Sequence, residues 1–359
     1  MTAAIVIGGG PAGAAAAIAL ARGGAAVTLV EREAGPREKV CGEFLGPDAA
    51  ALLRGLGRPL PELGAVPIHG ARLAAGRQDT AWPLPFAAWS LPRATLDEAL
   101  LAAAATAGAR VLRGRMVAGA AREGDGWTAR LGDGAVLRAP ALVLATGKHE
   151  LRGHSRPVRG GAVGLKLPLQ LLAPLDGRVV LLPFAGGYAG LQPRAGGGAN
   201  LCAALRKAGP EARNPVALLA RVAAGSAQGT VLLRGAVPLL KRPLAVAGVP
   251  YGFRHRDGAA AEPGLFRVGD QFAVVPSLAG EGVAMALLGG VAAAAAILAG
   301  QSAAAFHVAL NRRLDRPMRW AGMLAWLLDT TPDALALAAR ALPGAARLAA
   351  ARTRLPGLA

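Results

Sequence analysis

The sequence has 359 residues, which is long enough for one large or two medium domains with sizeable cores. Its net charge of +18 comes mostly from scattered arginines, and aromatic residues make up only 4% of the chain, so we expect no nucleic-acid partner. Two cysteines, Cys41 and Cys202, without metal-ligand spacing exclude a disulfide framework and indicate no metal site.

The first predicted elements are a strand, a glycine-rich turn and a helix. Ala3–Ile7 is a short apolar run rich in β-branched residues, typical of a buried parallel strand, and Ala14–Arg22 is an alanine-rich run that favours a helix. Gly8, Gly10 and Gly13 give the spacing GxGxxG between them. In this motif the glycines permit a tight turn, the approach of the backbone to a pyrophosphate and close helix packing, while the helix N-terminus favours an anion.

A second predicted strand, Ala26–Val30, ends in Glu31, near the distance expected for an acid that binds a ribose hydroxyl. A glycine-rich turn alone is weak evidence in a chain so rich in alanine and glycine. Here, however, strand, helix, second strand and acid occur in the order that a dinucleotide site requires. An acid suits the free ribose hydroxyl of FAD or NAD better than NADP. Because the apolar N-terminus is already a strand, we expect no signal peptide and a cytoplasmic location.

Helices and strands continue through the middle of the chain. In order, we expect a loop at Arg37–Phe44, a helix at Pro47–Leu56, short strands between Ile68 and Leu91, a helix at Arg93–Ala107 and a strand at Ala109–Arg113. A hairpin follows at Gly126–Leu131 and Ala135–Arg138, then a buried strand at Ala141–Ala145, an antiparallel sheet within Gly161–Gly252, and a parallel-type strand at Leu265–Val268.

A second glycine-rich segment lies far along the chain. Gly269-Asp270 follows a strand, and Gly280-Glu281-Gly282 opens a long apolar helix. The acid can accept hydrogen bonds from ribityl hydroxyls, and the N–H groups of the helix start can stabilise negative charge on a reduced flavin. Together the two segments predict FAD. The uncharged run Gly282–Gly300 has about the length of a membrane span, and we interpret it as a helix buried under the cofactor, with a transmembrane helix as the alternative.

The last segment, Arg312–Leu358, is basic and carries leucine-rich helical turns. Thr331-Pro332-Asp333 has the composition of an N-cap and first turn for one of its helices. Basic amphipathic helices are usually solvated outer faces of a fold, and they also lie on anionic membranes. The sequence leaves both interpretations open, so the location is cytoplasmic or peripheral to the inner face of a membrane.

The element order predicts an α/β fold with a discontinuous cofactor domain. We expect a Rossmann-like FAD-binding domain at 1–67, 92–155 and 262–300, an inserted, mainly antiparallel β-sheet substrate domain at 68–91 and 156–261, and a C-terminal helical region at 301–359.

Several motifs carry a resemblance to a known group of proteins. KVCGEF at Lys39–Phe44, LPRATLDEAL around Arg93 and the second glycine-rich segment resemble parts of FAD-dependent monooxygenases of the para-hydroxybenzoate hydroxylase type and of the related geranylgeranyl reductase-like flavoproteins. The resemblance implies that Lys39–Phe44 lies beside the flavin, that Arg93 faces the cofactor, and that Glu31 and Asp270 hold the ribose and the ribityl chain. The cofactor-binding candidates are Gly8, Gly10, Pro11, Ala12, Gly13, Glu31, Arg32, Arg37, Lys39, Cys41, Gly42, Arg93, Thr146, Gly147, Gly269, Asp270, Pro276, Gly280 and Gly282.

The chain departs from both relatives at two places. Aromatic hydroxylases carry Ala-Asp-Gly where this sequence has Ala145-Thr146-Gly147, which leaves the electron donor open. Geranylgeranyl reductases carry Tyr-x-Trp-x-Phe-Pro where this chain has Tyr188–Pro193 without the two large aromatic residues. The second departure weakens the assignment to a prenyl-chain reductase.

The resemblance implies a monooxygenase that hydroxylates or epoxidises an apolar or aromatic small molecule with O2, through a flavin C4a-hydroperoxide and with NAD(P)H as transient electron donor. The alternatives are a geranylgeranyl reductase-like reductase of isoprenoid double bonds and a non-catalytic flavin-binding or membrane-surface protein. Because the cofactor carries the chemistry, no catalytic triad is needed. The candidates for proton transfer are His149, His154, Tyr188 and His255, each of which also suits a structural role.

Overall fold

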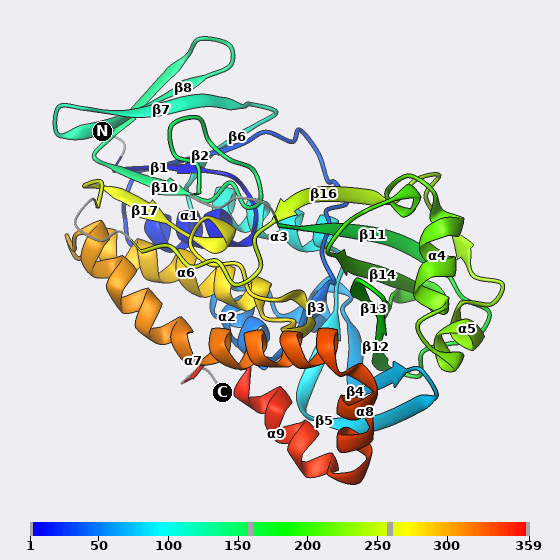
Figure 1. Cartoon of the computed structure of the whole chain (residues 1–359). Helices are drawn as coiled ribbons and strands as arrows, with labels where there is room; N and C mark the ends of the chain where they lie inside the picture. The colour runs from blue at the N-terminus through cyan, green and yellow to red at the C-terminus, as the bar shows by residue number, and fades with distance from the viewer. Residues whose placement is uncertain (1–2, 157–160, 257–260, 357–359) are drawn as a thin grey trace.

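A computed structural model describes residues 3–156, 161–256 and 261–356 (Figure 1). Its strands form a five-stranded sheet, a nine-stranded sheet and a separate three-stranded sheet. The five-stranded sheet and its helices lie on one side of the view, the nine-stranded sheet lies on the other, and the C-terminal helices run along the lower edge of both (Figure 1).

The five-stranded sheet is parallel throughout and has the order β17-β10-β1-β2-β6. Its strands are β1 (Ala4–Ile7), β2 (Val27–Glu31), β6 (Arg110–Arg113), β10 (Ala141–Leu144) and β17 (Leu265–Arg267). The inner strands β1 and β10 are buried along their whole length, as expected for a sheet covered on both faces. The Rossmann-like arrangement predicted from the sequence is confirmed.

The helices α1 (Pro11–Arg22) and α3 (Arg93–Thr106) pack against this sheet, and α6 (Gly282–Leu298) packs against α1. The helices α1 and α6 pack closely because Gly290 has no side chain, and a Cβ atom there would lie 2.1 Å from the carbonyl oxygen of Ala12. Much of α6 is buried in the core, which agrees with a helix under the cofactor site and not with a membrane span.

The nine-stranded sheet has the order β15-β11-β14-β13-β12-β4-β5-β3, with β16 paired to β11. Its strands are β3 (Phe44–Leu45), β4 (Val66–Ala75), β5 (Gln78–Ser90), β11 (Ala162–Gln170), β12 (Arg178–Phe184), β13 (Gly187–Pro193), β14 (Gly198–Leu205), β15 (Val237–Pro238) and β16 (Leu244–Val249).

Two expectations about this sheet were wrong in detail. The short strands expected between Ile68 and Leu91 are one long hairpin, β4–β5, with β3 at its edge. The region 161–252 is not only an antiparallel sheet, because β12 pairs in parallel with β4 and the helices α4 (Pro215–Ala223) and α5 (Ala227–Leu233) interrupt the strands. Asn214 and Ser226 cap these helices with their side chains, a signal that could have been found in the sequence.

The three-stranded sheet contains the expected hairpin, β8 (Gly126–Leu131) and β9 (Val136–Ala139), together with an additional strand, β7 (Val117–Glu123). The division of the chain into domains at the residues given above stays a prediction. Short 3-10 turns occur at Leu60–Leu63, Ala195–Gly197, Pro210–Ala212, Gly269–Gln271 and Ser277–Ala279.

The remaining helices are α2 (Pro47–Gly55), α7 (Ala303–Thr330), α8 (Pro332–Ala341) and α9 (Pro343–Arg352). Helix α8 begins as expected, with Thr331 at the N-cap position and with Pro332 and Asp333 in the first turn. The Thr331 hydroxyl donates to the carbonyl oxygen of Leu327 in α7 and makes no capping hydrogen bond to α8. Within the described residues, no helix alone has the length and apolar composition to cross a membrane. The pair α8 and α9 passes such a test only when taken together, with a bend of 112° between them.

Candidate cofactor and substrate site

A cleft of about 510 Å³ opens where the carboxyl ends of the parallel strands face the nine-stranded sheet. Most of the predicted cofactor residues line it. They are Gly8, Gly10, Pro11, Ala12, Glu31, Arg32, Arg37, Lys39, Cys41, Gly42, Arg93, Thr146, Gly147, Gly269, Asp270, Gly280 and Gly282. Gly13, in the first turn of helix α1, and Pro276, which precedes the 3-10 turn Ser277–Ala279, are not among the lining residues. Their roles in binding stay predictions.

The first glycine turn is too tight for any side chain at two positions. Gly8 has a φ of +105°, and a Cβ atom there would lie 2.4 Å from the carbonyl oxygen of Ala145. At Gly13, a Cβ atom would lie 1.9 Å from the carbonyl oxygen of Gly8. Gly10 is the N-cap of α1 and has no capping side chain, with Pro11 at the first helical position. The helix N-terminus therefore faces the cleft as a site for a phosphate, which fits FAD.

Glu31 at the end of β2 is buried, and both of its carboxylate oxygens accept hydrogen bonds from backbone N–H groups. One oxygen accepts from Gly9 at 2.6 Å, and the other accepts from Glu33 at 3.0 Å. The carboxylate therefore ties the end of the second strand to the glycine turn while it lines the cleft.

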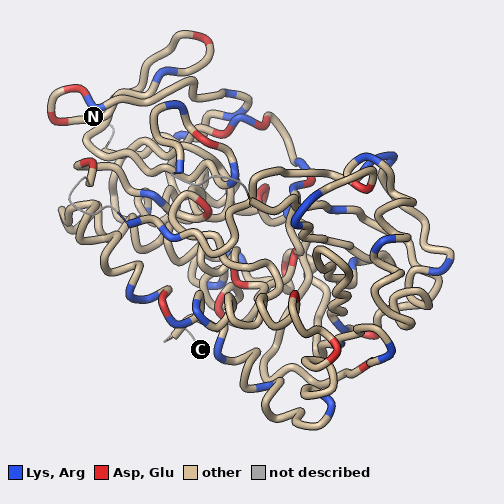
Figure 2. The backbone as a smooth tube through the Cα atoms, in the orientation of Figure 1, with Lys and Arg blue, Asp and Glu red and all other residues tan. Residues whose placement is uncertain are grey.

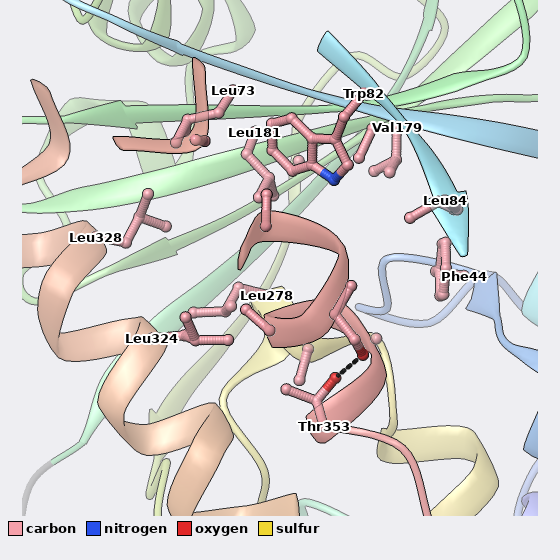
Figure 3. Close-up of a pocket in the computed structure, with 18 of the residues that line it drawn as sticks. Phe44, Leu73, Trp82, Leu84, Val179, Leu181, Leu278, Leu324, Leu328 and Thr353 are labelled. Carbon is pink, nitrogen blue, oxygen red and sulfur yellow. Dashed lines mark hydrogen bonds between the residues drawn. The ribbon is translucent and has the colours of Figure 1, made fainter. Parts of the chain in front are cut away.

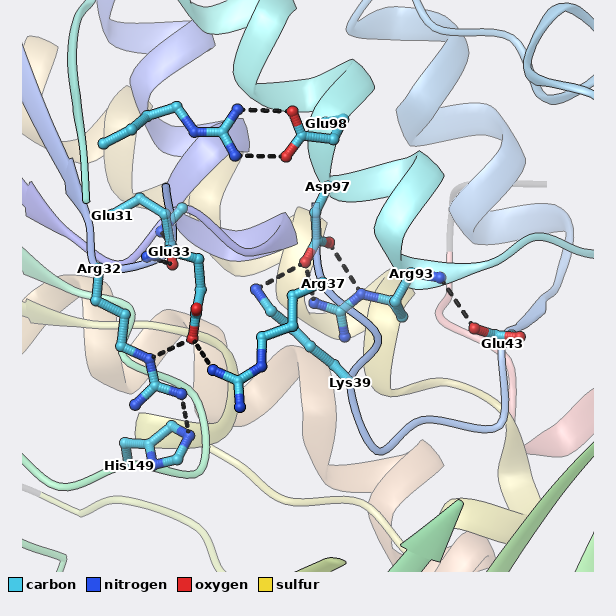
Figure 4. A network of polar contacts seen from close by, with 12 residues as sticks. Glu31, Arg32, Glu33, Arg37, Lys39, Glu43, Arg93, Asp97, Glu98 and His149 are labelled. Carbon is cyan, nitrogen blue, oxygen red and sulfur yellow. Dashed lines mark hydrogen bonds and ion pairs between the residues drawn. The ribbon is translucent and has the colours of Figure 1, made fainter. Parts of the chain in front are cut away.

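Arg93 is the centre of an ionic group on the wall of the cleft (Figure 4). Its guanidinium donates to both carboxylate oxygens of Asp97, at 2.9 and 3.0 Å, and the Lys39 ammonium lies 3.0 Å from the same carboxylate. Burial opposes the charge, but Asp97 outweighs it and raises the pKa of Arg93. The backbone N–H of Arg93 also donates to Glu43 at 3.0 Å. A positive charge thus lies near Gly10 on the wall of the cleft, and the role of Arg93 toward the cofactor stays a prediction.

A second ionic group lies at the outer part of the cleft (Figure 4). The carboxylate of Glu33 accepts from Arg32 at 3.1 Å and from Arg37 at 2.7 Å. Arg32 also lies 2.8 Å from the Nε2 atom of His149. Burial and the neighbouring cations, Arg32 first among them, lower the pKa of His149. His149 is therefore a neutral acceptor for Arg32, a role that positions the arginine and does not suit proton donation.

A cation at the turn after β10 was missed by the sequence prediction. Lys148 lies 3.0 Å from Asp270, and the Asp270 charge raises the pKa of Lys148 although burial opposes it. Both residues line the cleft. The signal was present, because Lys148 follows Ala145-Thr146-Gly147, where the resembling hydroxylases carry an acid.

A buried ionic cluster that was also missed holds the Lys39–Phe44 loop against the nine-stranded sheet. Lys166 of β11 is fully buried and contacts both Glu38 and Glu43, and Arg194 lies 2.8 Å from Glu38 and 3.7 Å from Glu43. Glu43 itself has a φ of +68°, which a residue with a side chain rarely adopts. Lys166 is the only charged residue in the apolar run AVGLKLPLQ, and a lone charge in such a strand could have indicated a buried partner.

A second cavity of about 320 Å³ lies between β4, β5 and β12 of the nine-stranded sheet and the helices α7, α8 and α9 (Figure 3). Its walls are mainly apolar and include Phe44, Leu73, Trp82, Leu84, Val179, Leu181, Leu278, Leu324 and Leu328. The two cavities share lining residues, namely Gly42, Phe44, Gln192, Cys202, Ser277 and Gly280. The apolar cavity therefore meets the cofactor cleft at the Lys39–Phe44 loop and the start of α6.

Weak acids gather at this junction. The Tyr188 hydroxyl lies 2.5 Å from the Ser277 hydroxyl and accepts from the backbone N–H of Leu278 at 3.0 Å. Burial raises the pKa of Tyr188 and of Tyr251, and it raises the pKa of the Cys202 thiol to about 12. These groups therefore keep their protons at neutral pH. Cys41 lines the cleft, and its sulfur accepts the backbone N–H of Glu43 at 3.3 Å.

The other two histidines proposed for proton transfer lie elsewhere. His255 packs edge-on against Phe272 with a centroid distance of 6.2 Å, and it is not among the residues that line either cavity. His154 lies 3.3 Å from Glu262 and 3.0 Å from the carbonyl oxygen of Ala120. Of the proton-transfer candidates, the structure places Tyr188 alone in the apolar cavity.

Arg354 and Leu355, which follow α9, lie next to the start of α6 and to α2. Arg354 contacts Glu281, and its guanidinium lies 4.8 Å from the ring centre of Phe86. The backbone N–H of Leu355 donates to Asp48 at 2.9 Å. Burial, together with the nearby Asp48, raises the pKa of Glu281 to about 8 against the opposing effect of Arg354. Glu281 thus holds the segment that follows α9 against the start of α6.

Comparison with known proteins agrees with this geometry. Residues 1–150 match the family model of the FAD binding domain. The chain is 33% identical over 156 residues to a menaquinone reductase of Mycolicibacterium smegmatis, a match that covers 42% of this chain and 38% of that protein. It is 35% identical over 122 residues to the flavin-dependent halogenase armH3 of Armillaria mellea, covering 32% of this chain and 24% of that protein. The chain therefore aligns with about two fifths or less of each relative's length.

The similarity in fold covers nearly the whole of this chain and of the solved structures that it resembles. A geranylgeranyl bacteriochlorophyll reductase-like protein of Thermoplasma acidophilum superposes with a TM-score of 0.77 and 19% identity, covering 99% of this chain and 97% of that chain. The flavin-dependent brominase Bmp2 superposes with a TM-score of 0.78 and 18% identity, covering 100% and 96%. Residues 1–150 therefore match an FAD binding domain, and the whole chain shares the fold of these solved structures. FAD is the cofactor that the glycine turns and the cleft fit.

Proposed function

We propose that this FAD-dependent oxidoreductase reduces a carbon–carbon double bond of an apolar, isoprenoid-like small molecule bound in the 320 Å³ cavity. The observation that carries the proposal is the junction at which a mainly apolar cavity meets the cofactor cleft beside weak acids. The partial match to menaquinone reductases supports a substrate of this class. The loss of aromatic residues in Tyr188–Pro193 changes the cavity wall and does not remove the cavity.

Different residues of the chain would bind the cofactor and donate the proton. The glycine turn, Glu31 and Arg93 would hold FAD, and FAD supplies two electrons and one proton to the substrate after reduction. The second proton must come from an acid that faces the substrate. Tyr188 suits this step because its hydroxyl is protonated at neutral pH and Ser277, 2.5 Å away, can return a proton to it. The apolar walls exclude water from the reacting bond.

Monooxygenation is the second candidate, and it is favoured by the match to a flavin-dependent halogenase and by the enclosed apolar cavity. In that reaction NAD(P)H supplies the electrons, one atom of O2 enters the substrate, and the other leaves as water. The same residues would bind the cofactor and the apolar substrate, so the two candidates differ in what is added to the substrate.

The mass of the product separates the candidates. Purified protein loaded with FAD would be reduced with NADH, with NADPH or photochemically, and then given geranylgeraniol or menaquinone with and without air. We expect a product heavier by two hydrogen atoms without air, and a rate about 100-fold lower for Tyr188→Phe with FAD binding unchanged. A product heavier by one oxygen atom, formed only in air, would support monooxygenation instead. A protein that binds no FAD would contradict both candidates and leave a non-catalytic role.

A further inference from the structure

The rest of the described fold covers little of the helix pair α8–α9. Helix α9 has ten residues, and none of them is buried. Helix α8 has only Ala336 and Ala339 buried. Helices gain most of their stability from packing one apolar face, so a helix without a buried residue is expected to have another surface to pack against.

The outer side of this pair carries large apolar side chains. Leu337 of α8 is 54% exposed and Leu348 of α9 is 51% exposed. Leu342, between the helices, is 62% exposed and also lines the 320 Å³ cavity. Three exposed leucines within one short helix pair differ from the scattered apolar residues of an ordinary surface.

Basic side chains accompany these leucines. Residues 332–352 contain Arg340, Arg347 and Arg352 and only one acid, Asp333. Figure 2 shows blue segments along the helices at the lower edge of the molecule, where α8 and α9 lie. Leucines and arginines on a helix pair of this kind complement the acyl chains and the anionic headgroups of a lipid bilayer.

The inner side of the same pair has the opposite character. Ala338, Ala345, Ala346, Ala349 and Ala350 line the 320 Å³ cavity together with Leu342. Alanines make up most of the cavity-lining side of the pair, and Leu335 and Leu342 are larger residues on that side. A layer one helix thick separates the cavity from whatever lies against the outer face.

We propose that α8 and α9 dock on an anionic lipid bilayer, with Leu337 and Leu348 inserted at the headgroup boundary and the arginines against the headgroups. The apolar cavity then lies one helix layer away from the lipid, in which an apolar substrate dissolves. The docking of α8 and α9 on lipid is inferred from their exposed side chains and their charge. Only the idea that the substrate enters from the lipid rests on the proposed function.

Sedimentation with vesicles tests the surface without any turnover. The full chain loaded with FAD would be mixed with vesicles of phosphatidylcholine alone and with vesicles that contain about one third phosphatidylglycerol. We expect binding to the anionic vesicles. Reversing two charges, in Arg340→Glu/Arg347→Glu, should weaken it by about fivefold per arginine or more. Leu337→Ser/Leu348→Ser should weaken it by about tenfold and abolish the part of the binding that survives high salt.

The controls are matched in exposure and charge and lie in other parts of the fold. Leu172→Ser/Leu239→Ser changes leucines that are 78% and 55% exposed, and Arg122→Glu/Arg138→Glu changes exposed arginines of β7 and β9, at the opposite edge of Figure 1. Both should bind as the unmodified chain does. The proposal is overturned if the unmodified chain does not bind anionic vesicles, or if the controls lose as much binding as the helix variants. Equal losses would mean that the net charge of +18 alone attracts the lipid. Because these vesicles hold no substrate, failure of the proposed reaction would leave the result unaffected.

Discussion

The cofactor cleft and the apolar cavity are built in different ways, although they share an edge. Charged side chains line the cleft, and several of them form close ion pairs, as Arg93 does with Asp97 and Lys148 with Asp270. Among the described residues that line the apolar cavity, Arg354 alone is charged. The cleft is thus organised by directional contacts, whereas the cavity is organised by the size of apolar side chains.

This difference has a consequence for substitution. A directional contact fails when one partner is lost, because the remaining polar group is buried without compensation. An apolar wall tolerates changes of shape as long as the volume is kept. We therefore expect the cleft to lose folding stability or FAD when single residues change, and the cavity to change the choice of substrate with little effect on FAD.

The largest effect is expected at the buried cluster that holds the Lys39–Phe44 loop. Lys166→Met removes the buried one of the two cations that Glu38 and Glu43 share, the other being Arg194, which should lower the free energy of unfolding by about 3–5 kcal/mol in urea titrations. The double variant Lys166→Met/Glu43→Gln should recover part of that loss. Arg72→Met, which breaks a half-exposed pair with Asp79, should cost at most about 1 kcal/mol. Equal losses for the buried and the half-exposed pair would show that the cluster does not organise the cleft.

The next effect concerns the glycine turn. In Gly8→Ala the new Cβ atom would lie 2.4 Å from the carbonyl oxygen of Ala145, in a backbone conformation that alanine rarely adopts. The turn must shift, and we expect FAD to bind about 100-fold more weakly in fluorescence titrations. Gly35→Ala is a matched control, because a Cβ atom there has no other atom within 4 Å. Unchanged FAD affinity in Gly8→Ala would show that the conformation of the glycine turn does not contribute to FAD binding.

The free energy of unfolding should depend on pH through Glu281, which lies at the start of α6. Its pKa is raised to about 8 in the folded protein from 4.5 for an ordinary glutamate, so the folded chain binds this proton more tightly than the unfolded chain. The free energy of unfolding should therefore fall as the pH rises from about 4.5 to about 8, by a few kcal/mol at about 1.4 kcal/mol for each pKa unit. Glu281→Gln should flatten this slope in denaturation curves, and Glu62→Gln, at an exposed site, should not. A slope that is equal in all three proteins would show that Glu281 does not titrate as its burial implies.

The contrast between the two cavities also explains which parts of the fold and of the site could be predicted from the sequence. The first strand–helix–strand unit of the sheet and the glycine turns were predictable because each lies within a short segment whose spacing follows from backbone geometry, as with Gly8 and Gly13. The missed residues act across long separations, as Lys166 does with Glu38 and Arg354 does with Glu281. Nothing near Lys166 or Arg354 in the chain shows which partner it meets, because the pairing depends on how the sheets and the C-terminal helices pack.

The apolar cavity was unpredictable for the same reason, since its walls come from β4, β5, β12 and the C-terminal helices. Alanines such as Ala349 look like ordinary helix formers in the sequence. Their importance lies in the volume that they leave open, which appears only when α9 is placed against the hairpin β4–β5.

The smallest predicted effect tests this volume directly. Ala349→Phe places a large ring on the inner side of α9, where it should fill part of the cavity and displace a long apolar substrate. We expect the KM for such a substrate to rise by about tenfold, with a smaller rise for a short analogue, because the long chain needs the filled space. FAD affinity should stay unchanged, since Ala349 does not line the cleft. Ala351→Phe on the exposed side of the same helix is the control, and it should leave both constants as they are. If Ala349→Phe altered FAD binding and substrate KM together, the two cavities would not be separately organised, and their division into a directional cleft and a tolerant apolar wall would fail.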